Sequence, residues 1–180
     1  MADFNSFWPV LLKAEGYYAN KKNDSGGETW MGIARNYWPS WEGWKIVDSY
    51  KSSPDFPKIM RQDGNLLKMV QAFYRVHFWA AIAGDQINNQ SIVNMIGDWG
   101  VNAGEKVPIK HAQAILGLAT DGVAGPKTVA AINSADQETF FNHLKQDRIQ
   151  FYYAVVAKHP EDKQFLGDWI SRTNAITFSA

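Results

Sequence analysis

The sequence contains no cysteine and no excess of charge of either sign. The lack of cysteine excludes disulfides, zinc sites built on thiolates and a cysteine nucleophile. Lys and Arg number 18, as do Asp and Glu, and no basic run occurs, so the positive surface that nucleic acids and anionic membranes require is missing. The four histidines are scattered without paired spacing. We therefore expect no nucleic-acid partner, no membrane insertion, no metal and no cofactor.

Apolar residues at helical spacing dominate the 180 residues, which are enough for one compact core. No long stretch after residue 40 alternates with a period of two, as a strand would. The sequence therefore predicts a mainly α-helical fold with at most a small β-hairpin near residues 17–30. Beyond the first forty residues, helices are expected around 66–78, 92–99, 106–116, 126–133, 137–157 and 161–175, with 92–99 as the central buried helix because it is apolar nearly all round.

The first forty residues are expected to contain two short helices separated by a polar loop. In the first, Asp3, Asn5 and Ser6 could each cap; Ser6 is the preferred cap because Pro9 would then fall in the first turn. That helix is expected to finish near Glu15, with Gly16 as its stop. The second helix is expected over 29–38, where Pro39 halts it.

Glu15, Asp24 and Thr29 form a candidate catalytic set. At the end of an apolar helix, both partial burial and the helix dipole would raise the pKa of Glu15, as acid-catalysed cleavage of a glycosidic bond requires. Asp24 lies in a loop of amides and glycines that would keep it ionised, and the Thr29 hydroxyl could position a water. Glu28 and Asp98 are alternative second carboxylates. An ordinary polar turn after a helix would show the same residues.

Two motifs in this region resemble those of family 108 of the glycoside hydrolases, which are N-acetylmuramidases of bacteria and phages. Glu15-Gly16-Tyr17-Tyr18 resembles the family motif E-G-G-Y, with Tyr17 in place of the second glycine. Asp24-Ser25-Gly26-Gly27-Glu28-Thr29-Trp30-Met31-Gly32-Ile33 is similar to D-x-G-G-x-T-x-x-G-I at every position. The resemblance implies a lysozyme-like fold in which Glu15, Asp24 and Thr29 are catalytic and Tyr18 contacts the substrate.

Two further segments resemble parts of peptidoglycan-acting proteins. Asp98 to Gly104 is similar to the end of the family's central helix, which implies that Trp99 and Asn102 contact the substrate; a helix end with a buried Trp is the alternative. Residues 112–128 resemble the LQ...LG...DG..G..T pattern of small helical peptidoglycan-binding repeats, although any helix-loop-helix could use the same residues. We expect a catalytic part over residues 1–95 and a peptidoglycan-binding-like part over 96–180, packed as one unit.

The resemblance implies a lysozyme that cleaves the β-1,4 bond between N-acetylmuramic acid and N-acetylglucosamine. Two alternatives stay open: a lytic transglycosylase that uses the acid alone, and a non-catalytic peptidoglycan-binding or regulatory protein. The N-terminus has neither a basic start nor a small-residue cleavage site. The chain is therefore expected to be made in the cytoplasm without a Sec signal peptide and to reach the periplasm or cell wall through a holin, a secretion partner or lysis. We also expect it to be a monomer.

Overall fold

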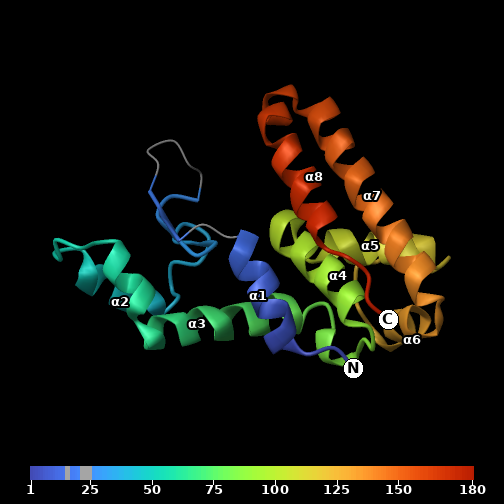
Figure 1. The fold of residues 1–180 in the computed structure, drawn as a ribbon, viewed down its shortest axis with the longest axis horizontal. Coiled ribbons are helices and arrows are strands. Elements are labelled where there is room, and N and C mark those ends of the chain that lie inside the picture. Colours follow the sequence, from blue (N-terminus) through green and yellow to red (C-terminus); the bar gives the residue numbers. More distant parts are fainter. Residues whose placement is uncertain (15–16, 21–25) are drawn as a thin grey trace. The chain divides into compact units, whose positions relative to one another are not determined.

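The computed structural model describes residues 1–14, 17–20 and 26–180, and within these ranges helices dominate (Figure 1). The predicted mainly α-helical class is therefore confirmed. The chain divides into two compact units, Met1–Val10 with Val76–Ala180, and Leu11–Arg75. The elements in chain order are α1 (Phe4–Ala14), β1 (Tyr18–Ala19), β2 (Thr29–Trp30), β3 (Ile33–Ala34), α2 (Gly43–Tyr50), η1 (Lys58–Gln62), α3 (Gly64–Tyr74), η2 (Arg75–Trp79), η3 (Gly84–Gln86), α4 (Gln90–Ala103), α5 (Lys106–Ile115), α6 (Pro126–Ser134), α7 (Gln137–Lys158), η4 (Pro160–Phe165) and α8 (Leu166–Ala175).

The first helix begins earlier than expected. α1 starts at Phe4, and Asp3 rather than Ser6 caps it: the Asp3 carbonyl accepts from the Ser6 and Phe7 N–H groups, and its carboxylate accepts from the Asn5 N–H at 3.1 Å. Pro9 consequently lies inside the helix and not in its first turn. The preference for Ser6 was wrong because it gave the position of the proline more weight than the Asp3 cap. The expected end at Glu15 and Gly16 lies outside the described residues.

A three-stranded antiparallel sheet replaces the helix expected over 29–38. β2 pairs with β1 on one side and with β3 on the other, and Met31-Gly32 is the two-residue turn between β2 and β3. Both turn residues have positive φ, 46° and 81°, as the type I′ turn of a tight hairpin needs. The helix prediction was wrong because it ignored Gly32, at which the chain reverses direction in a tight turn.

The unit of residues 11–75 is built around an aromatic cluster. Trp38 meets Phe73 edge-on at 4.9 Å between ring centroids, and Trp41 meets Trp44 edge-on at 5.2 Å. The Trp44 indole N–H donates to the Trp38 carbonyl at 2.8 Å. Trp44 is therefore part of the core and lies in α2, a helix that the sequence did not predict, whereas Trp38 and Trp41 are half-buried. α2 and η1 both pack on α3.

The other unit is organised around α4, where residues 91–93 and 95–100 are all buried. This confirms the prediction of a central buried helix. α5 and α7 pack against α4, and α8 lies along α7 (Figure 1). The helices expected around 106–116, 126–133 and 137–157 are confirmed, and the 161–175 segment forms η4 and α8. The division of the chain near residue 95 stays a prediction; α4 runs without a break through that residue.

Candidate active site and wall-binding region

The predicted site residues fall into three groups. Glu15 and Asp24 lie outside the described residues. Tyr18 and Thr29 belong to the unit of residues 11–75, and Trp99 and Asn102 belong to the other unit.

Thr29 lies on the central strand of the sheet with small neighbours on its own face. It pairs with Ala19 of β1 and Ala34 of β3, and directly paired residues share a face. Trp30, the next residue along the strand, points to the opposite face and is fully buried. The Thr29 hydroxyl makes one long hydrogen bond, at 3.4 Å, to the Gly27 carbonyl. The hydroxyl is half-buried and weakly held, and it can exchange this bond for one to a water.

Tyr18 lies on the other face and takes part in a hydrogen bond with a buried carboxylate. It pairs with Trp30, so its side chain and that of Thr29 point away from each other. Its hydroxyl donates to Glu28 at 3.0 Å and its ring meets Phe56 edge-on at 4.8 Å. Burial, and then the bond to Glu28, raise the pKa of Tyr18, so the hydroxyl remains a donor at neutral pH.

Glu28 is held by two cations in addition to Tyr18. Its Oε2 atom lies 2.7 Å from Arg35 Nε and 3.0 Å from Lys51 Nζ. Both cations also pair with Asp48 of α2, at 2.6 Å and 2.7 Å. The hydrogen bonds from Arg35, and then from Lys51, lower the pKa of Asp48. Two carboxylates and two cations thus join the sheet to α2, which favours a structural role for Glu28 over that of a catalytic carboxylate.

Tyr17, which stands where the family motif has its second glycine, has an ordinary backbone. Among the described residues other than glycine, only Met31 and Ala83 have positive φ. The Tyr17 carbonyl accepts the Met31 N–H and thereby extends the pairing of β1 with the hairpin. A side chain at this position therefore causes no strain in this conformation.

Asp98, the other alternative carboxylate, is buried between two guanidinium groups. It is 1% exposed. Arg148 of α7 donates to its Oδ2 at 2.7 Å. Arg172 of α8 donates to Oδ1 at 2.9 Å from Nη2, and from Nε to Oδ1 and Oδ2 at 3.1 Å and 3.0 Å. The carboxylate therefore joins α4, α7 and α8, and both of its oxygens accept hydrogen bonds from these two arginines.

Asn102 lies at the outer end of a hydrogen-bond chain with a fixed direction. Arg148 Nε donates to the Tyr152 hydroxyl at 3.2 Å, and that hydroxyl donates to Asn102 Oδ1 at 2.8 Å. Because a guanidinium can only donate, the Tyr152 proton must point to Asn102. Asn102 is exposed, so the group it offers to a ligand is its NH₂.

Trp99 is fully buried beneath this region. Its ring centroid lies 4.7 Å from that of His111 and 5.6 Å from that of Phe151. A direct contact with substrate would require the side chain to move outward. Of the two interpretations of Trp99, burial favours packing, and substrate contact stays a prediction.

The DG-containing pattern of residues 112–128 forms an internal network around Gln113. This side chain is 1% exposed, donates to Asp121, Thr128 and the Val123 carbonyl at 2.6–3.1 Å, and accepts the Gly122 N–H at 2.9 Å. Gly122 has a φ of 76°, and a Cβ there would lie 3.2 Å from Lys106, so glycine is required. The pattern thus encodes the loop that joins α5 to α6.

Replacing Gln113 with Ala is expected to lower the free energy of unfolding by about 1–3 kcal/mol, because it leaves the buried Gly122 N–H and Thr128 hydroxyl without this partner. Urea denaturation followed by circular dichroism measures the change. Gln146→Ala, an exposed position on α7, is the matched control. Equal stability of the two variants would contradict the structural role of Gln113.

Several neighbours of the candidate site residues were not predicted from the sequence. Arg35 and Lys51 hold Glu28, and Arg148 and Tyr152 link Asp98 to Asn102. The sequence signal for Arg148 was its position on the predicted 137–157 helix, four residues after Leu144 and therefore on the same buried face. Among the described residues, no group of three or more His, Cys, Asp or Glu could hold a metal ion, and no helix there is long and apolar enough to cross a membrane.

Thr29 of the predicted catalytic set lies on a small sheet, and the helical region that follows contains the peptidoglycan-binding-like pattern. Both features are those expected of a glycoside hydrolase that acts on peptidoglycan. Comparison with known families agrees. Glycosyl hydrolase 108 matches residues 8–104, and a family described as a predicted peptidoglycan domain matches residues 107–174. The first match covers more than half of the chain, and the protein belongs to the glycosyl hydrolase 108 family.

Solved structures show the same fold. Eleven chains match, among them the structure of Brucella abortus SagA, with a TM-score of 0.64 and 24% identity over 98% of this chain and 97% of that chain. No curated protein matches the chain.

Proposed function

We propose that this glycoside hydrolase is an N-acetylmuramidase, which hydrolyses the β-1,4 bond between N-acetylmuramic acid and N-acetylglucosamine. The observation that carries the proposal is the place of Thr29 between two alanines on the central strand, within the family match and five residues after Asp24. The surroundings of Glu28 and Asp98 add support, because both alternative carboxylates are already paired with two cations each.

In the proposed reaction, Glu15 protonates the glycosidic oxygen as the bond to the anomeric carbon breaks. Asp24 stabilises the positive charge that develops on the sugar or removes a proton from the attacking water, and Thr29 orients that water. The water oxygen forms the new bond to the anomeric carbon. The products are a reducing N-acetylmuramic acid end and a free 4-hydroxyl on N-acetylglucosamine.

Three side chains are proposed as substrate contacts. Asn102 would donate through its NH₂ group to a sugar carbonyl or hydroxyl, in the direction that Tyr152 sets. Tyr18 would contribute through its ring edge while its hydroxyl remains on Glu28. Trp99 is buried, so it would contact the substrate directly only if its side chain moved outward; otherwise it would support the residues above it by packing.

The products of wild-type digestion test the proposal. Purified peptidoglycan is incubated with the protein, and the soluble muropeptides are identified by mass spectrometry, with Glu15→Gln prepared in the same way as the control. Reducing-end muropeptides are expected. Products with 1,6-anhydro ends would indicate a lytic transglycosylase, and retained binding without any products would indicate a binding protein.

The site of action is the cell wall, where the substrate is. For the route, we propose export through a holin or a secretion partner, or release on lysis, and action as a monomer. Sedimentation at several protein concentrations tests the last point.

A further inference from the structure

An exposed aromatic ring and an exposed guanidinium are stacked at the start of the sheet. The guanidinium carbon of Arg61 lies 3.9 Å from the centroid of the Tyr17 ring, and Tyr17 is 47% exposed. The same ring lies 6.4 Å from that of the buried Trp30, which supports it from below. A guanidinium stacked on a ring keeps its N–H groups in its own plane, where they remain able to bind a carboxylate.

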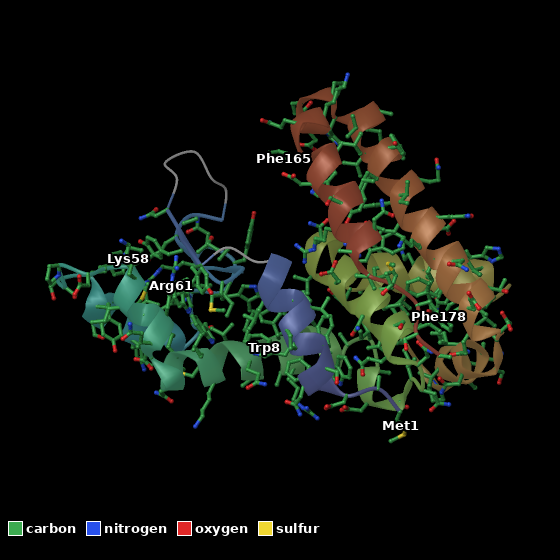
Figure 2. All side chains as sticks on the ribbon, in the orientation of Figure 1. Met1, Trp8, Lys58, Arg61, Phe165 and Phe178 are labelled. Carbon is green, nitrogen blue, oxygen red and sulfur yellow. The ribbon has the colours of Figure 1, made fainter. Side chains whose placement is uncertain are left out.

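A second cation lies on the same side of the short helix η1. Three residues per turn in a 3-10 helix place Lys58 and Arg61 one above the other, and both are exposed (Figure 2). Neither forms an ion pair with a carboxylate of the described residues, whereas Arg35 and Lys51 of the same unit each pair with two. Both side chains are exposed, so an anion from outside the chain can reach them.

The position of η1 is fixed by buried and capping contacts. Met60, between the two cations, is fully buried. Phe56, just before η1, meets the Tyr18 ring, and Asp63, just after it, accepts from the Leu66 N–H at 2.8 Å and from the Tyr50 hydroxyl at 2.9 Å. Arg61 is therefore held over Tyr17, and Lys58 on the same short helix, before any ligand binds, which lowers the entropic cost of binding.

We propose that Tyr17, Arg61 and Lys58 form a subsite for a carboxylate on the muramyl side of the peptidoglycan strand. Arg61 would bind the carboxylate, Lys58 would add a second charge and the exposed part of the Tyr17 ring would contact the apolar atoms beside it. Tyr17 follows Glu15 by two residues, so this inference rests on the proposed muramidase function for its substrate. It gives a positive role to the residue that replaces the motif glycine.

Two carboxylates of peptidoglycan have this chemistry. One is the lactyl carboxylate of a muramyl residue without a peptide, and the other belongs to the stem peptide. Three probes separate them: strands that carry stem peptides, strands from which an amidase has removed the peptides, and peptide-free strands whose carboxylates have been converted to neutral amides.

The test measures the dissociation constant of each probe by calorimetry in a Glu15→Gln background, so that strands stay intact and the result is independent of hydrolysis. Arg61→Gln is expected to weaken binding of a carboxylate-bearing strand by about 5- to 20-fold, below the full worth of a charge-assisted bond because the site is exposed. Lys58→Gln is expected to weaken it by about 2- to 5-fold. Neither should change binding of the amidated strands.

Lys68→Gln removes the same charge from an exposed position on α3 and is the matched control. Tyr17→Phe should bind as the parent does, and Tyr17→Gly should weaken binding of the charged probes. Loss on peptide-free strands would assign the lactyl carboxylate, and loss only on peptide-bearing strands the stem peptide. Equal losses on charged and amidated strands, or no binding of charged strands by the parent, would overturn the subsite. If the Glu15→Gln parent binds charged strands but the wild type releases no products in the digestion, the muramidase alone would be overturned.

Discussion

Replacing Asp98 with Asn is expected to lower the free energy of unfolding by about 3–5 kcal/mol, the range observed when one member of a buried ion pair is removed. The carboxylate is 1% exposed, and Arg148, one of its two cationic partners, is fully buried. Without the negative charge, two guanidinium groups would face each other around a neutral amide whose NH₂ cannot accept their hydrogen bonds. Urea denaturation monitored by circular dichroism measures the loss.

Asp168→Asn makes the same change at an exposed position on α8 and should leave stability within about 0.5 kcal/mol of the wild type. Arg172→Gln should also destabilise, and the double variant with Asp98→Asn should lose less than the sum of the two single losses, because both act on one network. If Asp98→Asn were no more destabilising than Asp168→Asn, the network would not hold α4, α7 and α8 together.

The helices with strong periodicity were predicted well from the sequence, because burial on one side forces apolar residues to recur every three or four positions. α4 is the clearest case, since it is apolar nearly all round and its residues 91–93 and 95–100 are buried. The Asp121-Gly122 turn and Pro126 at the start of α6 were also read correctly, because each depends on local backbone chemistry.

The errors lie where a few residues make a sharp reversal or where tertiary contacts decide. β2 and β3 have two residues each, too few to show a period of two, and the turn places the non-glycine residue Met31 at positive φ. α2 was missed because Trp44 was assigned to a connection. In the structure its indole N–H donates to the Trp38 carbonyl and its ring is buried in the core.

The candidate site could be predicted only as far as its motif. A sequence shows that Glu28 and Asp98 are carboxylates, but not that Lys51 lies 23 residues from its partner or Arg148 50 residues from its own. Those cations decide the role of each carboxylate. The second carboxylate of the reaction has to contact the sugar or the attacking water, whereas the oxygens of Glu28 and Asp98 are bound to Tyr18 and to cations of the fold.

That distinction predicts different results for three similar substitutions. Glu15→Gln and Asp24→Asn should each lower kcat for peptidoglycan cleavage by about 10²–10⁴-fold, because each removes one group that acts in proton transfer or charge stabilisation. Both should leave the free energy of unfolding near that of the wild type. The release of reducing ends from purified peptidoglycan, measured at saturating substrate, gives kcat.

Glu28→Gln is the matched control, with the same chemical change four residues from Asp24. It removes the charge that Arg35 and Lys51 neutralise, so it should lower the free energy of unfolding by about 1–3 kcal/mol, while kcat measured well below its melting temperature stays within a few-fold of the wild type. If Glu28→Gln abolished cleavage in a folded protein while Asp24→Asn did not, Glu28 would be the second carboxylate. If cleavage with anhydro products survived Asp24→Asn, no second carboxylate would be needed, and the muramyl 6-hydroxyl would replace water as the attacking group.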